Sequence, residues 1–181
     1  MNHFYQNIHG WFDFDNIYKS MVENAQDGFH FVEVGAWKGK SAAYMCVEIA
    51  NSGKQIKFDC VDIWTGAGGV YDFDLSVKNQ TLYDEFIANM LPVEKYYTPV
   101  KEFSDKAAKL YLDNSLDFVF IDAGHDYENI SADIDAWLPK VKSGGWIGGH
   151  DYMSAPGVRQ AVSERFSAVK LDGTSWLLHK K

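Results

Sequence analysis

The sequence predicts an α/β fold: a doubly wound, mostly parallel sheet of about seven strands that ends in an antiparallel hairpin. Short β-rich runs alternate five times with segments whose apolar residues recur at helical spacing, which is typical of parallel strands joined by crossover helices. Residues 116–122 are almost continuously apolar, as expected of a central strand covered on both faces. The dipeptide Asp172-Gly173 separates the last two runs and is a strong hairpin signal.

The elements follow in order along the chain. Strands are expected at 29–35, 57–63, 96–102, 116–122 and 146–151, with the hairpin formed by 167–171 and 175–181. Helices are expected at 40–51, at 82–91 before Pro92, at 104–111 with Ser104 as the N-cap, at 130–141, and at 154–166. Residues 64–79 contain three glycines and are expected to form the longest loop.

The chain has 181 residues, which allows one domain with a small appendage. Residues 1–27 are aromatic and amphipathic, and we expect them to form a helical cover or lid over a domain spanning 28–181. Aromatic residues make up 15% of the sequence, more than so small a core requires. Those of the first segment and of the 64–79 loop are expected to line a substrate lid or a subunit interface: Phe4, Tyr5, Trp11, Phe12, Phe14, Tyr18, Trp64, Tyr71 and Phe73.

Composition argues against several classes of partner. The net charge of −8 disfavours binding to nucleic acid, because that binding depends on Lys and Arg. No run of about 18 apolar residues is present, and the first residues lack the pattern of a secretory signal, so we expect a cytoplasmic protein with no membrane partner. Cys46 and Cys60 lie in apolar stretches and are expected to be buried free thiols.

The turn after the first expected strand has the composition of a ligand-binding loop. Gly35 and Gly39 are separated by three residues, which lets the backbone approach a ligand where the helix begins. Glu33 precedes this turn and suits a ligand that carries a positive amine. We expect Glu33, Gly35, Gly39 and Ser41 to form this site, although a tight packing turn would have the same glycines.

Asp62 ends the second expected strand, 23 residues beyond Gly39. This offset is close to that at which a carboxylate binds ribose hydroxyls in βαβ nucleotide sites. Ile63 and Trp64 would then flank an adenine ring. The alternative is an Asp that only caps a turn.

His and Asp residues follow the fourth and fifth expected strands. Because these strands are expected to be neighbours, Asp122 and Asp151 should lie within several ångströms of each other and could share a divalent cation. His150 is a candidate third ligand; Mg²⁺ is favoured by the oxygen ligands, and Mn²⁺ is also compatible. A neutral His125 could accept a proton from a substrate hydroxyl. Purely structural histidines are the alternative.

These segments resemble class I S-adenosylmethionine-dependent methyltransferases. The resemblance is closest to metal-dependent O-methyltransferases similar to macrocin O-methyltransferase and to cephalosporin-hydroxylase-like proteins. It covers about residues 28–181 and is carried by 33–41, by Asp62 and, most specifically, by 120–127 and 144–152. It implies a Rossmann-like fold.

The resemblance also implies roles for individual residues. The Gly35–Gly39 turn would hold the methionine end of S-adenosylmethionine, Asp62 the ribose and Ser104 the adenine side. Asp122 and Asp151 would bind the metal, with Asp122 also beside the cofactor, and His125 would be the general base. His150 stands where relatives of the macrolide-sugar type have an acidic residue, which leaves open whether a metal is required and which one.

The expected function is therefore methyl transfer from S-adenosylmethionine to a hydroxyl of a small molecule. The acceptor could be a sugar, a catechol-like phenol or another polyol, stacked on Trp37, Trp64 or Tyr71. Whether the chain forms a homo-oligomer stays open. Other readings are a protein of the same fold with hydroxylase-like chemistry, an NAD-dependent oxidoreductase, a metal-dependent hydrolase and a non-catalytic binding module. The absence of a third glycine in the turn disfavours the oxidoreductase.

Overall fold

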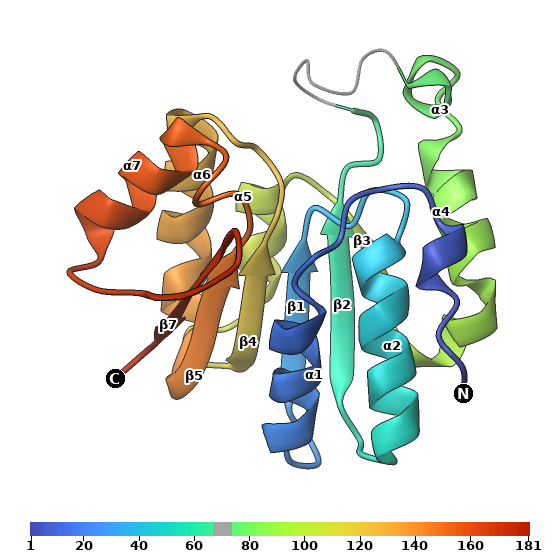
Figure 1. Cartoon of the computed structure of the whole chain (residues 1–181), viewed down its shortest axis with the longest axis horizontal. Helices are drawn as coiled ribbons and strands as arrows, with labels where there is room; N and C mark the ends of the chain where they lie inside the picture. Colours follow the sequence, from blue (N-terminus) through green and yellow to red (C-terminus); the bar gives the residue numbers. More distant parts are fainter. Residues whose placement is uncertain (67–73) are drawn as a thin grey trace.

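A computed structural model describes residues 1–66 and 74–181 of the chain. Within these ranges, seven strands form one sheet in the order β3-β2-β1-β4-β5-β7-β6 (Figure 1). The strands are β1 (His30–Val34), β2 (Lys57–Asp62), β3 (Thr98–Lys101), β4 (Leu116–Ile121), β5 (Val141–Gly149), β6 (Lys170–Asp172) and β7 (Ser175–His179). Strands β1 to β5 are parallel, whereas β7 runs antiparallel to β5 and β6. The predicted fold class is confirmed.

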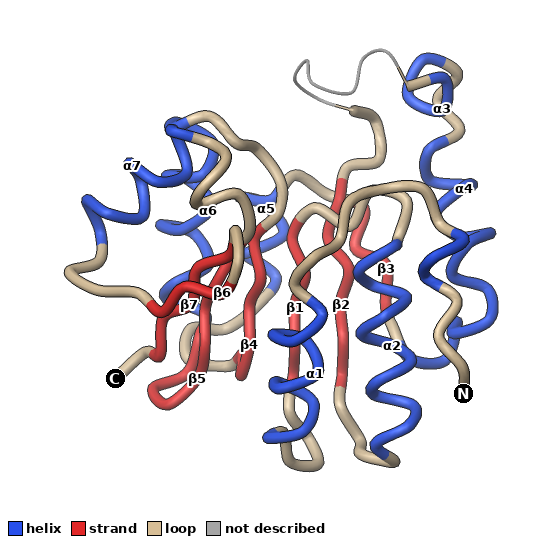
Figure 2. Tube along the Cα trace, viewed as in Figure 1, coloured by secondary structure: helices blue, strands red, loops and turns tan. Residues whose placement is uncertain are grey.

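Helices cover both faces of this sheet (Figure 2). They are α1 (Asp15–Asn24), α2 (Lys40–Ser52), α3 (Leu75–Lys78), α4 (Leu82–Met90), α5 (Ser104–Ala107), α6 (Tyr127–Trp137) and α7 (Pro156–Arg165). Short 3₁₀ turns cover Tyr5–Asn7, Leu91–Tyr96, Ala108–Leu110 and Leu138–Lys140. No helix of the described ranges is both long and apolar enough to cross a membrane.

Alternation of side chains along the central strands divides the core into two layers. Phe118 and Phe120 of β4 pack in the cluster that includes α1, α2 and α4. Val119 and Ile121 belong to the opposite cluster, with α5, α6 and α7. Successive residues of a strand point to opposite faces, so a strand buried on both sides is expected to be mainly apolar. This explains why the run at 116–121 lacks the polar alternation of an exposed sheet.

Several expected elements differ from those of the structure. Helix α6 ends at Trp137, and Val141 begins β5, because Pro139 falls in the 3₁₀ turn between them and cannot continue the helix. Phe103, not Ser104, is the N-cap of α5, and this cap has no side-chain hydrogen bond. The short helix α3 lies within the expected 64–79 loop, where Asp74 caps it by accepting a hydrogen bond from the Ser76 amide.

Most aromatic residues of the first segment pack against the core. Phe14 and Tyr18 are buried against Phe120, with ring centroids 4.5 and 5.3 Å away. Phe4, Tyr5 and Phe12 are partly buried against the same cluster, while Trp11 is 65% exposed. Tyr71 and Phe73 lie outside the described residues. Cys46 and Cys60 are buried free thiols, as expected.

Candidate functional site

The Gly35–Gly39 turn is shaped by close contacts that exclude side chains. Gly35 has φ +97°, and a Cβ atom added to it would lie 2.0 Å from the backbone oxygen of Asp122. Gly39, the N-cap of α2, has φ +87°, and its Cβ would lie 2.9 Å from Met90 Cγ. Both positions therefore require glycine. Packing alone accounts for glycine at both positions, and the turn lies directly against the end of β4.

Glu33 is buried beneath this turn. One of its carboxyl oxygens accepts a hydrogen bond from the Ser41 hydroxyl, and the buried Tyr18 hydroxyl interacts with the same carboxyl. Burial raises the pKa of Glu33 to about 8, although the bond from Ser41 opposes this rise. Glu33 has no exposed surface, so a direct contact with a ligand requires the turn above it to shift.

The raised pKa of Glu33 makes stability depend on pH. The folded carboxyl keeps its proton up to about pH 8, whereas its ordinary pKa is 4.5. Between these values the folded state binds more protons than the unfolded state, so the free energy of unfolding falls as pH rises. We expect the cofactor-free protein to lose a few kcal/mol over this interval, since one pKa unit corresponds to about 1.4 kcal/mol. Glu33→Gln should flatten the curve measured by urea unfolding at pH 5, 6.5 and 8, and parallel curves for the two proteins would contradict it.

Asp62 joins the two turns that follow β1 and β2. Its Oδ2 accepts a hydrogen bond from the Trp37 amide at 2.8 Å, and its Oδ1 accepts one from the Trp64 amide at 2.7 Å. Burial raises the pKa of Asp62, while these backbone bonds act in the opposite direction. Trp37 and Trp64 adopt positive φ angles of 42° and 50°. The carboxylate thus fixes both turns, and its remaining lone pairs are those that a diol could use.

Two of the expected cofactor contacts are occupied by packing. The Trp64 ring is only 2% exposed and packs against Tyr83 and Phe86, so it is not free to flank an adenine, while Ile63 beside it is half-buried. The Ser104 hydroxyl accepts a hydrogen bond from the Trp137 indole at 2.9 Å. Its place at the start of α5 follows β3, as expected, but its hydroxyl serves the contact between α5 and α6.

Lys38, whose role was not predicted from the sequence, is buried and fixes the position of the Gly35–Gly39 turn. Lys38 Nζ lies 2.9 Å from Asp74 and 3.2 Å from Glu85. These ion pairs tie α3 and α4 to the turn. The sequence contains no motif that pairs Lys38 with Asp74. Their contact depends on where α3 packs in the folded chain.

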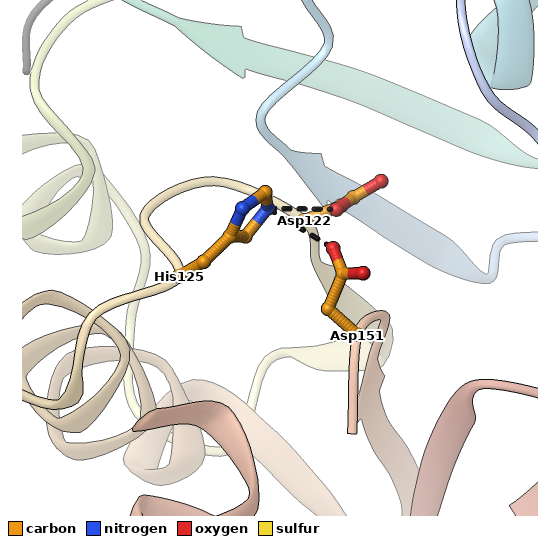
Figure 3. A group of neighbouring side chains, drawn as sticks. All are labelled: Asp122, His125 and Asp151. Atoms are coloured by element: carbon orange, nitrogen blue, oxygen red, sulfur yellow. Dashed lines mark ion pairs between the residues drawn. The ribbon is translucent and has the colours of Figure 1, made fainter. Parts of the chain in front are cut away.

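The expected His and Asp cluster forms where β4 and β5 end (Figure 3). Ile121 pairs with Gly149, so the next residues, Asp122 and His150, leave the sheet side by side. Asp151 has φ +60°, which turns its side chain back toward Asp122. His125 Nε2 lies 3.6 Å from Asp122 Oδ1 and 3.1 Å from Asp151 Oδ2. The ligand atoms of Asp122, His125 and Asp151 all lie within 4.8 Å of one another, and these residues could hold a metal ion.

His150 approaches the same two carboxylates from the other side. Its Nδ1 lies 3.7 Å from Asp122 Oδ1 and 3.2 Å from Asp151 Oδ2. Its Nε2 lies 2.8 Å from Asp13 Oδ1 and 2.7 Å from Thr174 Oγ1. We expected His150 as the third ligand and His125 as a separate base; the structure brings both imidazoles to the carboxylates. Asp13 and Thr174 were not anticipated, because their contacts bridge distant segments.

The two carboxylates and two imidazoles of this cluster stabilise each other's charged forms. The hydrogen bond from His150 lowers the pKa of Asp151 to about 2. Burial would raise the pKa of Asp122, but bonds from both histidines hold it below its usual value. The hydrogen bond to Asp122 raises the pKa of His125. Burial alone would lower the pKa of His150, but its hydrogen bonds to Asp122 and Asp151 raise this pKa to about 11. A bound divalent cation would replace this positive charge and compete with the protons on the imidazoles.

Comparison with known proteins identifies the family. A family model described as a methyltransferase domain matches residues 32–152, which include the glycine turn, Asp62 and the His and Asp cluster. The chain belongs to this methyltransferase family. The predicted methyltransferase resemblance is confirmed, and use of S-adenosylmethionine follows from the family. No curated protein matches the chain.

Solved structures of methyltransferases share the fold. The O-methyltransferase NovP matches with a TM-score of 0.70 and 18% identity, covering 92% of this chain and 79% of NovP. The calicheamicin methyltransferase CalS11 matches with a TM-score of 0.65 and 14% identity, covering 91% of this chain and 76% of CalS11. MycE, a methyltransferase from mycinamycin biosynthesis, matches with a TM-score of 0.58 and 13% identity, covering 92% of this chain and 48% of MycE. At these identities the likeness concerns the fold.

Proposed function

We propose that this methyltransferase transfers the methyl group of S-adenosylmethionine to a hydroxyl of a small molecule, with a divalent metal positioning the acceptor and His125 as general base. One observation carries the proposal: the glycine turn is packed against the His and Asp cluster. Gly35 approaches the Asp122 backbone so closely that no side chain fits between them. A methyl donor held by this turn would therefore lie beside groups able to bind and deprotonate an acceptor.

The chemistry of the turn fits S-adenosylmethionine. Glu33 is buried beneath the turn, and an ammonium group bound above it would favour loss of the Glu33 proton, so that the carboxylate would then face the positive charge. The Gly35–Gly39 backbone would hold the methionine end, with Ser41 fixing Glu33. Asp62 would accept hydrogen bonds from the ribose, and Ile63 would contact the adenine. Ser104 is the weakest of the proposed contacts, because its hydroxyl is already engaged by Trp137.

The donor set of the cluster fits a divalent metal. Carboxylate oxygens of Asp122 and Asp151 with an imidazole nitrogen suit Mg²⁺ or Mn²⁺, the imidazole broadening the choice beyond Mg²⁺. We assign Asp122, Asp151 and His150 as ligands, since His150 Nδ1 faces both carboxylates while its Nε2 is held by Asp13. A bound divalent metal lowers the pKa of a hydroxyl that it contacts. MycE was crystallised with Mg and SAH, which supports a metal in this fold.

His125 remains for the base role. It follows the end of β4 on a separate loop, and its Nε2 lies 3.1 Å from Asp151 Oδ2. Among the described residues its side chain has polar contacts with Asp122 and Asp151 but no outer partner such as Asp13. With those carboxylates engaged by a cation, the imidazole would lose the interactions that keep it protonated and could accept the proton of the acceptor hydroxyl. The in-line transfer itself then depends on alignment.

The acceptor is proposed to be small because the structurally similar proteins include CalS11, described as a TDP-rhamnose 3'-O-methyltransferase of calicheamicin biosynthesis. Trp37 is half-buried in the glycine turn, and the exposed Trp11 stacks on it at 6.0 Å and 22°. Flat apolar faces of a sugar or an aromatic ring could pack on this pair. Hydroxylase-like chemistry or nicotinamide use on the same fold remain the competing functions to test.

Calorimetric titration with S-adenosylmethionine and with NAD⁺, each with and without Mg²⁺, tests the proposal. We expect binding of S-adenosylmethionine, no binding of NAD⁺, and transfer of a labelled methyl group to small hydroxyl compounds in a product screen. EDTA should abolish transfer, and Mg²⁺ or Mn²⁺ should restore it. Binding of NAD⁺ alone would overturn the methyltransferase proposal, whereas transfer that is insensitive to EDTA would overturn only the role of the metal.

A further inference from the structure

Three distant segments meet at the outer side of His150. Asp13 Oδ1 lies 2.8 Å from His150 Nε2, Thr174 Oγ1 lies 2.7 Å from the same nitrogen, and Thr174 Oγ1 lies 3.3 Å from both Asp13 oxygens. The opposite nitrogen, Nδ1, faces Asp122 and Asp151. The ring thus has one nitrogen toward the proposed metal site and one toward the first segment of the chain.

The segment that carries Asp13 is firmly placed. Phe14, the N-cap of α1, is 2% exposed, and its ring packs against Phe120 at 4.5 Å and His150 at 5.1 Å. The turn that carries Thr174 is also held, because the Tyr152 amide donates a hydrogen bond to the Thr174 carbonyl at 2.8 Å. Asp13 therefore does not depend on its own contact with His150 to remain near it.

This arrangement matches the outer shell of histidine metal sites. A metal-binding imidazole commonly donates its other N–H to a carboxylate, which fixes the tautomer and the orientation of the ring. If His150 Nε2 donates to Asp13, Nδ1 keeps its lone pair for the cation. We propose that Asp13 is a positioning residue that orients His150 and thereby sets the affinity of the site for a divalent cation. The inference rests on the metal assigned under the proposed function.

The test measures Mn²⁺ binding directly, by electron paramagnetic resonance titration of free Mn²⁺, with Mg²⁺ as competitor. Asp13→Ala should weaken Mn²⁺ binding by about 10–100-fold, the usual cost of losing an outer-shell partner. Asp13→Asn should retain more affinity, because its side-chain oxygen can still accept the hydrogen bond. Thr174→Val gives a second variant at the same nitrogen and should weaken binding less than Asp13→Ala. Asp15→Asn is the matched control, since Asp15 begins α1 and, within residues 1–66 and 74–181, has no hydrogen bond or ion pair with the cluster.

Affinity for S-adenosylmethionine and thermal unfolding complete the experiment. Both should stay close to wild type in every Asp13 variant, which separates loss of orientation from loss of folding. Wild-type affinity for Mn²⁺ in Asp13→Ala would overturn the inference alone. Wild-type protein that binds S-adenosylmethionine but no Mn²⁺ would overturn both the inference and the metal. Failure to bind S-adenosylmethionine at all would count against the proposed function instead.

Discussion

Replacement of His125 by alanine is expected to lower kcat for methyl transfer by about 10²–10⁴-fold, the usual contribution of a positioned general base. His125 Nε2 lies within 3.6 Å of Asp122 and 3.1 Å of Asp151, so it faces the place where an acceptor hydroxyl would be held. The dissociation constant for S-adenosylmethionine should stay unchanged, because the imidazole lies outside the glycine turn. Single-turnover transfer of a labelled methyl group, with calorimetry for the cofactor, measures both quantities.

The same variant separates a base from a metal ligand. Asp122, His125 and Asp151 form a compact group that could itself hold an ion. If His125 is a ligand, His125→Ala should weaken Mn²⁺ binding as well as turnover; if it is the base, Mn²⁺ affinity should persist while turnover is lost. His179→Ala is the control, since His179 is exposed at the end of β7 and contacts the Gly144 carbonyl. Undiminished transfer by His125→Ala would reject both roles.

Gly35→Ala is expected to lower the free energy of unfolding by about 2–5 kcal/mol and to abolish measurable binding of S-adenosylmethionine. Two costs add: a left-handed backbone conformation carrying a side chain, about 1–2 kcal/mol, and overpacking, about 1–3 kcal/mol. The added Cβ would lie 2.0 Å from the Asp122 oxygen, and the nearest atoms belong to the backbone of Asp122 and Ala123, which leaves little room to adjust. Urea unfolding and calorimetric titration give the two effects.

Gly28→Ala is the matched control for that experiment. Gly28 has φ +87°, close to the value at Gly35, but a Cβ there would meet nothing within 4 Å. Gly28→Ala should therefore lower the free energy of unfolding only by the cost of the left-handed backbone conformation, and affinity for S-adenosylmethionine should be unchanged. Equal losses in the two variants would mean that the contact between Gly35 and Asp122 contributes nothing.

The sheet and the strand ends were predictable because they follow from local patterns. Apolar runs such as 116–121 define the central strands, and parallel connections bring their carboxyl ends to one edge, which is why Asp122 and Asp151 could be predicted to lie together. Helix ends near prolines were harder. Val141 continued the apolar spacing of α6, although Pro139 had already ended the helix. Spacing alone could not tell a helical stripe from the start of the next strand.

Side-chain partners from distant segments could not be predicted. The contact between Asp13 and His150 spans 137 positions and has no sequence motif, since it depends on how Phe14 packs on Phe120. Trp64 was expected to flank the adenine, but its ring is buried against Phe86 of α4. That contact depends on the position of α4, which the local sequence does not show. Local pattern gives the type of side chain at a strand end; its orientation depends on the packing around it.

The contact between Asp13 and Thr174 joins residues 161 positions apart and has a consequence for how the protein is made. During synthesis, Asp13 leaves the ribosome long before His150 and Thr174 exist as chain. Closing a loop of this length carries a large entropic cost, so this contact should form late, after β5 and β7 have paired. A nascent chain ending before β6 could assemble the glycine turn and still lack an ordered His150. We therefore expect the folding chain to become able to bind the cofactor before it becomes able to bind the proposed metal.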